Sequence, residues 1–144
     1  MPNPFSSASL VPNWTKATEI LKGDVSGHEF HGNQYVSAGN QVAESQKLND
    51  YVNNTAIGLI DHNAVAEQHR TIARALEETA KPLEGEKGQL GRIRDAYVKA
   101  AEAHRFAAGR HIAALTGFSH LGAADATGKA HDASLKADEL NYAN

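Results

Sequence analysis

The chain has 144 residues, of which 41% are hydrophobic and only 6% aromatic, and its formal net charge is -3. This length suits one domain, and the apolar residues are mostly alanine, which favours closely packed helices over a sheet sandwich. The small net charge and the lack of a basic run argue against a nucleic-acid partner. The absence of cysteine excludes disulfides, thiolate metal sites and cysteine nucleophiles.

The first 38 residues are predicted to form an extended arm. Three prolines within residues 1–12 disfavour helix there, and Phe5 is expected to lie in a groove. A short helix is predicted over residues 14–22, with Trp14 docking it on the rest of the protein. The N-terminus lacks the charge and the apolar run of a signal peptide, and no stretch of the chain reaches the roughly 18 apolar residues of a membrane span.

From residue 39 to residue 144 the pattern predicts a helical bundle. The expected fold class is all-α, a small antiparallel bundle of three to four helices over about 40–80, 89–116 and 119–140. The first of these segments is either one long bent helix or two helices, because weak helix formers interrupt it near residue 58 and Asp61 or Asn63 can cap a second helix.

The two later helices carry periodic stripes that are expected to face the core. In the segment 89–116 the stripe consists of Leu90, Ile93, Tyr97, Ala101, His104, Ala108, His111, Ile112 and Leu115. In the segment 119–140, which Ser119 can cap, it consists of Leu121, Ala124, Gly128, His131 and Leu135.

Histidine is frequent, with eight residues, and its spacing is regular. His62 and His69 are seven residues apart, as are His104 and His111, so each pair lies on one helical face about 10 Å apart along the axis. If the two helices pack antiparallel, four histidines line one seam, and His131 extends this histidine stripe to the last helix. Protonation of such a seam is predicted to weaken stability or assembly as the pH falls.

The histidine pattern does not match a known metal motif. The Glu-x-x-His arrangement of di-iron bundles is missing, because the residues three before the stripe histidines are Leu59, Ala66, Ala101 and Ala108. His28 and His31 are three apart, but loop carboxylates would have to complete their site. No metal and no cofactor is therefore expected.

Motifs of catalysis are also missing. The serines lack a Gly-x-Ser-x-Gly context, and no Walker loop or Rossmann fingerprint occurs. His28 and Glu29 beside Asn33 form the one acid–base pair that is conceivable from the sequence. The expectation is a protein without enzymatic activity and without catalytic residues, and a histidine- or metal-dependent enzyme stays an alternative.

The most distinctive stretch is Gly-His-Glu-Phe-His-Gly-Asn-Gln-Tyr over residues 27–35. It resembles a motif, G-H-x-F-x-G-N-Q-aromatic, found in head and virion-assembly proteins of tailed bacteriophages, where Ala-rich helices with recurring histidines follow it. Alanines also surround His104 and His131 in this chain. The residues expected to form an interface with neighbouring proteins are Phe5, Trp14, Gly27, His28, Phe30, His31, Gly32, Asn33, Gln34 and Tyr35.

This resemblance implies a structural protein of a phage particle, such as a minor capsid protein, a cement (decoration) protein or another head-associated component. Its expected partners are the major capsid protein or neighbouring head subunits, with multimeric assembly in the virion and no membrane. Three alternatives remain open beside it: a connector or internal DNA-associated protein, an assembly scaffold or chaperone, and the enzyme mentioned above.

Overall fold

A computed structural model of the chain describes residues 30, 32–33 and 35–143. The predicted short helix over 14–22 and most of the predicted arm lie outside the described residues. The part of the arm that is described, up to residue 38, contains no helix and no strand.

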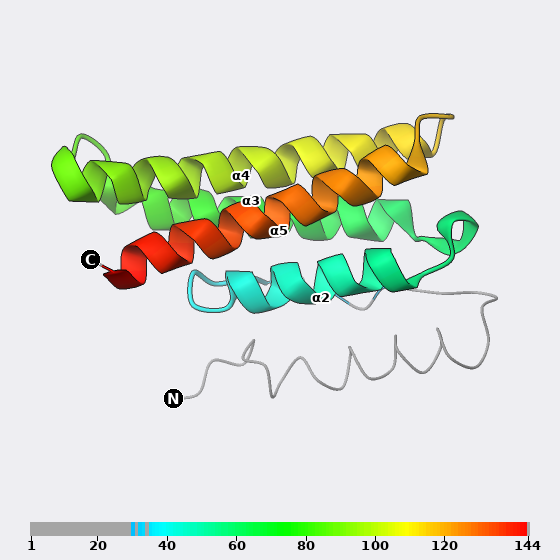
Figure 1. Cartoon of the computed structure of the whole chain (residues 1–144), viewed down its shortest axis with the longest axis horizontal. Coiled ribbons are helices and arrows are strands. Elements are labelled where there is room, and N and C mark those ends of the chain that lie inside the picture. Colours follow the sequence, from blue (N-terminus) through cyan, green and yellow to red (C-terminus); the bar gives the residue numbers. More distant parts are fainter. Residues whose placement is uncertain (1–29, 31, 34, 144) are drawn as a thin grey trace.

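The described part of the chain is an antiparallel helical bundle, which confirms the all-α prediction (Figure 1). Its four α-helices are α2 (Gln41–Asn54), α3 (His62–Ala80), α4 (Gly88–Ala114) and α5 (His120–Ala143), and successive helices run in opposite directions. Helix α4 packs extensively against both α3 and α5, and α2 packs mainly against α5. The termini of successive helices therefore lie close together, joined by short connections.

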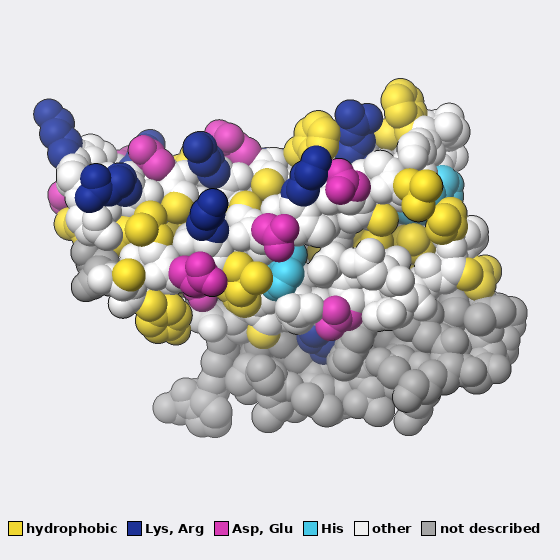
Figure 2. Space-filling view, viewed as in Figure 1, with side chains coloured by type: hydrophobic (Ala, Val, Ile, Leu, Met, Phe, Trp, Pro, Cys, Tyr) yellow, Lys and Arg dark blue, Asp and Glu magenta, His cyan; other side chains and the backbone are white. Residues whose placement is uncertain are grey.

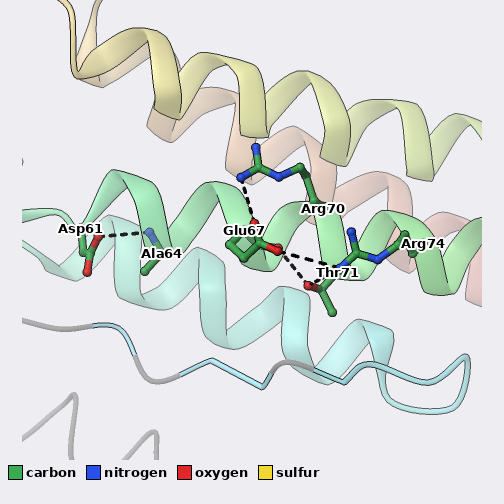
Figure 3. A network of polar contacts seen from close by, with 6 residues as sticks. All are labelled: Asp61, Ala64, Glu67, Arg70, Thr71 and Arg74. Carbon is green, nitrogen blue, oxygen red and sulfur yellow. Dashed lines mark hydrogen bonds and ion pairs between the residues drawn. The ribbon is translucent and has the colours of Figure 1, made fainter.

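The segment 40–80 forms two helices, which decides between the two alternatives. Helix α2 ends at Asn54, and a 3-10 turn, η1 (Ile57–Leu59), precedes α3. Asp61 caps α3, because its Oδ1 accepts the backbone N–H of Ala64 at 3.1 Å (Figure 3). The hydroxyl of Tyr51 accepts the backbone N–H of Asp61 at 3.1 Å, so the connection is also tied to α2.

The outer face of α3 carries charged side chains that pair along the helix (Figure 3). Glu67 accepts a hydrogen bond from Arg70 at 3.0 Å and lies 4.0 Å from Arg74. These side chains are more than a third exposed, so they keep this face solvated and contribute little to stability.

The sharp turn between α4 and α5 uses residues suited to it. Gly117 has a φ of 104°, a conformation that favours glycine, and lies three residues after Ala114, the last residue of α4. Ser119 Oγ accepts the backbone N–H of Gly122 at 3.0 Å, which confirms its predicted role as a cap. A second 3-10 turn, η2 (Lys81–Leu83), and Gly88 with a φ of 64° connect α3 to α4.

The interior combines large apolar side chains with many alanines, and its composition corrects two of the predicted stripes. Leu90 and Ile112 of α4 and Leu115 just after it are exposed rather than in the core. Ile93 and Tyr97 are buried as predicted. In α5, Leu121 is 69% exposed. The face of α5 that is buried consists of Ala123, Ala126, Thr127, Ala130, His131, Ser134 and Ala137. Alanines and hydroxyls therefore line the buried face of α5, whereas large buried side chains such as Leu48, Ile72 and Leu76 come from α2 and α3.

Candidate functional site

The four histidines of α3 and α4 meet in the interior, as their spacing predicts for an antiparallel pair. The Nδ1 atoms of His62 and His111 lie 2.8 Å apart, and so do the Nδ1 atoms of His69 and His104. All four residues are buried. The rings of His69 and His111 are stacked with centroids 5.7 Å apart, so the two pairs are adjacent layers of one seam.

Helix α5 supplies the partners for the remaining ring nitrogens. Thr127 Oγ1 lies 2.8 Å from His69 Nε2 and 2.7 Å from His111 Nε2. Ser134 Oγ lies 2.8 Å from His104 Nε2, and His120 Nδ1 lies 3.0 Å from His62 Nε2. We call the connected set the histidine–hydroxyl chain. Its members, in bonding order, are His120, His62, His111, Thr127, His69, His104 and Ser134.

A seven-residue spacing on all three helices produces this arrangement. His120, Thr127 and Ser134 are seven apart on α5, matching the spacing of the histidines on α3 and α4. Seven residues of α-helix rise about 10.5 Å, so the three helices bring polar groups together at the same levels. The contribution of His120, Thr127 and Ser134 was missing from the sequence prediction, which had placed only His131 of this helix in the histidine stripe. The recurrence of polar residues at this interval was the signal that would have found it.

Burial keeps the seam histidines neutral. It lowers the pKa of His104 to about 3 and that of His111 to about 4, and it lowers the pKa of His69 well below its ordinary value. The pKa of His62 is also lowered, by burial and then by the nearby His120, although the carboxylate of Asp61 opposes this shift. Near neutral pH each of these rings therefore offers one N–H donor and one nitrogen acceptor.

His131, the fifth member of the predicted stripe, belongs to a separate buried cluster. Its Nδ1 lies 2.8 Å from Ser45 Oγ, and its Nε2 lies 2.9 Å from Gln46 Oε1. The amide oxygen can only accept, so His131 donates from Nε2 and accepts from the serine hydroxyl. Burial lowers the pKa of this ring, while Asp132 and Asp50 oppose the shift.

The histidine geometry fits hydrogen bonds better than metal coordination. Two nitrogens bound to one tetrahedral zinc ion lie roughly 3.3 Å apart, given Zn–N bonds of about 2.0 Å. The facing ring nitrogens here are 2.8 to 3.0 Å apart, and the two nitrogens of His62 face two different rings. Among the described residues no group of three or more His, Asp or Glu is arranged to hold a metal ion.

The described part of the motif segment packs on the protein's own helices. Phe30 is buried, and its ring centroid lies 4.9 Å from that of Tyr51 in α2. Asn33 donates from its side-chain amide to Glu44 Oε2 at 3.2 Å. Glu44 is buried as well and accepts a 2.7 Å hydrogen bond from Gln68 of α3. Burial raises the pKa of Glu44, while Lys47 and the backbone N–H of Asn33 oppose the shift.

The glycine of the motif at position 32 has a steric explanation. A Cβ at this position would lie 2.5 Å from Cε1 of Phe30 and 2.7 Å from Oε1 of Gln68. The backbone thus passes close to both side chains, and glycine is the residue that allows this approach.

The interface residues expected from the sequence are divided by the structure. Phe30 and Asn33 contact the protein's own body, whereas the side chain of Tyr35 is 57% exposed. The other expected interface residues, namely Phe5, Trp14, Gly27, His28, His31 and Gln34, lie outside the described residues, as does Glu29 of the conceivable acid–base pair. The interface role of these residues stays a prediction.

The comparisons add no relative to this picture. No family model, no curated protein and no solved structure matches the chain. Within the described ranges, no helix has both the length and the apolar character required to cross a bilayer.

Proposed function

We propose that this protein is a non-enzymatic structural component of a bacteriophage particle that docks on neighbouring head subunits. The phage context comes from the resemblance of residues 27–35. The observation that carries the docking role is the exposure of large apolar side chains where α4 gives way to α5. Leu115, Phe118 and Leu121 are 50%, 58% and 69% exposed, and Figure 2 shows apolar side chains gathered at this end of the molecule. Such clustering is typical of protein–protein contact sites.

The placement of the polar groups supports docking over catalysis. The ring nitrogens of the buried histidines already have protein partners within hydrogen-bond distance, and only small areas of histidine are visible on the face drawn in Figure 2. Ser134 and Ser45, the serines bonded to histidines, are both buried. A nucleophile must be reachable by its substrate, so these pairs fit a structural role.

The proposed partner is another protein of the particle. An apolar cluster of this kind suits a subunit interface, where assembly adds to the stability of a small-residue core. A connector, an internal DNA-associated protein and an assembly scaffold are the competing roles within the same phage context. They differ in copy number and in their presence in the finished particle, which makes them separable by experiment.

The test is quantitative mass spectrometry of purified virions produced with the wild-type chain and with variants. A shell component is expected at on the order of hundreds of copies, whereas about a dozen indicates a connector and absence indicates a scaffold or a protein foreign to the particle. Phe118→Ser combined with Leu121→Ser should reduce incorporation at least tenfold, which corresponds to about 1.4 kcal/mol of binding free energy.

A matched control lies at the other end of α5. Tyr142 is 86% exposed, so Tyr142→Ser removes a large side chain that is even more accessible than Phe118 and Leu121 and lies away from the proposed contact. Equal incorporation of both variants and the wild type, with unchanged folding by circular dichroism, contradicts docking through the α4–α5 end.

A further inference from the structure

The histidine–hydroxyl chain is a continuous run of six hydrogen-bond distances through the bundle. The six separations range from 2.7 to 3.0 Å. Each link joins two different helices, and the order α5, α3, α4 repeats along the run. The chain therefore ties these three helices together at successive levels.

Counting hydrogens shows that the links are coupled. The hydroxyl of Thr127 has one hydrogen and lies between two ring nitrogens, so it donates to one ring and accepts from the other. This choice gives His69 and His111 opposite tautomers, and each of them then determines the ring beyond it. When the Thr127 hydroxyl donates to one of its two rings and all rings are neutral, only two arrangements of the hydrogens place one hydrogen in every link. In one of them all links donate from His120 toward Ser134, and in the other all links donate in the opposite direction.

A backbone carbonyl favours one of the two directions. The carbonyl oxygen of Ile57 lies 3.2 Å from His120 Nδ1, where it can only accept. A hydrogen on this Nδ1 is therefore preferred, and every link then donates from His120 toward Ser134. In this arrangement the α3 residues His62 and His69 carry hydrogen on Nδ1, whereas the α4 residues His104 and His111 carry it on Nε2.

We propose that the histidine–hydroxyl chain is an acid-operated latch, which holds α3 against α4 and α5 while its rings are neutral and releases them together when it is protonated. An added proton first reorients the links on one side of the ring that accepts it. After this reorientation the links donate outward toward both ends of the histidine–hydroxyl chain. A further proton then places two hydrogens between two facing atoms that are only 2.7 to 3.0 Å apart. The buried charges also repel one another, because neighbouring ring centroids are 4.6 to 5.7 Å apart. Release is therefore cooperative.

The surroundings place the entry of protons at one end. Asp61, at the start of α3, favours the charged form of His62, and His120 is only partly buried. The charged neighbours that lower the pKa of His69 and His111 are other histidines of the histidine–hydroxyl chain. The charged neighbour that lowers the pKa of His104 is His131 of α5. Asp50 of α2 and Asp132 of α5 act on His131 rather than on the chain. None of these neighbours of His69, His104 and His111 is a carboxylate that could compensate a positive charge on the ring.

The test is nuclear magnetic resonance of the ¹⁵N-labelled full chain, reading the imidazole nitrogens from about pH 8 to about pH 4 together with circular dichroism. At the upper pH, His62 and His69 should share one tautomer, and His104 and His111 should share the other. On acidification the four rings should gain protons at one common midpoint with a Hill coefficient above one, as tertiary packing is lost.

Substitutions of Thr127 test whether the four rings titrate together because they are hydrogen-bonded through its hydroxyl or only because each ring is buried. Thr127→Val removes the central hydroxyl and should split the titration into one midpoint for His62 with His111 and another for His69 with His104, and Thr127→Ser should restore a single midpoint. Ser45→Ala is the matched control, because it removes a buried hydroxyl 2.8 Å from His131, outside the chain. It should move the signals of His131 and leave the four rings with a single midpoint.

Several results overturn the latch. The first is a different tautomer for His62 and His69, or for His104 and His111. The second is a set of rings that titrate one by one while the bundle stays folded. The third is a Thr127→Val variant that titrates like the wild type. Stoichiometric binding of added Zn²⁺ by the four rings at neutral pH also overturns it. Should Thr127→Val fail to fold, the tautomers and the common midpoint of the wild type and of Thr127→Ser decide the matter.

Discussion

The ring of Phe30 packs against the ring of Tyr51, with centroids 4.9 Å apart and planes tilted by 45°. Tyr51 in turn accepts the backbone N–H of Asp61 at the start of α3. The first aromatic residue of the motif over residues 27–35 is therefore connected to the junction of α2 and α3. This contact makes Phe30 part of the protein's own core, so its role and that of Tyr35 can be tested separately.

Phe30→Ala should destabilise the protein by about 3 kcal/mol, because it removes a buried aromatic ring and leaves a cavity beside Tyr51. Tyr35→Ala should change the free energy of unfolding by less than about 0.5 kcal/mol, since that side chain is largely exposed. Urea denaturation followed by circular dichroism measures both. Equal effects of the two substitutions would show that the contact with Tyr51 does not stabilise the bundle.

Gly32→Ala should destabilise the protein by about 1 to 3 kcal/mol, because the new Cβ would clash with the ring of Phe30 and the amide of Gln68. The matched control is Gly58→Ala, at a position where an added Cβ meets nothing within 4 Å. Thermal denaturation of both variants compares them directly. A Gly32→Ala protein as stable as the control would mean that the motif segment adjusts without cost.

Stability should fall as the pH drops below about 6.5, the ordinary pKa of histidine. Burial lowers the pKa of His69, His104 and His111, so the folded state binds fewer protons than the unfolded state and loses stability on acidification. At pH 5 the rings of His104 and His111 each cost about 2 kcal/mol relative to neutral pH, and His69 adds to the loss in the same direction. The loss is a large fraction of the total stability of a typical domain. The loss levels off only near pH 4 for His111 and near pH 3 for His104.

Urea denaturation at a series of pH values measures this dependence. Glu44 acts in the opposite sense, because its raised pKa makes the folded state less stable as the pH rises above the ordinary value of 4.5. Glu44→Gln is therefore the background in which the histidine contribution is seen alone. A free energy of unfolding that stays constant between pH 8 and pH 5 in both proteins would rule out the neutral histidine seam.

Asp61→Ala should cost about 1 kcal/mol, because the carboxylate caps α3 through the backbone N–H of Ala64. Asn63→Ala is the control, since Asn63 is exposed in the first turn of the same helix. Chemical denaturation of the two variants gives the difference. A loss as large for Asn63→Ala as for Asp61→Ala would assign the effect to the helix rather than to its cap.

Sequence periodicity predicted the helices and the meeting of the histidines. The spacing of His62, His69, His104 and His111 requires only that two regular helices pack antiparallel, and helical geometry then brings the rings together. Asp61 and Ser119 were recognisable as caps because capping depends on residues three positions away. These features are local, or they follow from one assumption about packing.

The face that α5 turns to the core was decided by the tertiary structure. Periodicity of large apolar residues pointed to Leu121, but α5 buries alanines, Thr127, His131 and Ser134 instead. The buried ring nitrogens of His69, His104 and His111 find their hydroxyl partners on this face. The tertiary structure also decided the break between α2 and α3 and the packing of Phe30 against Tyr51. The sequence alone determined the helices and their polar spacing. Which side chains the helices enclose depends on the distance between them, because burial favours only the groups that fit and find hydrogen-bond partners.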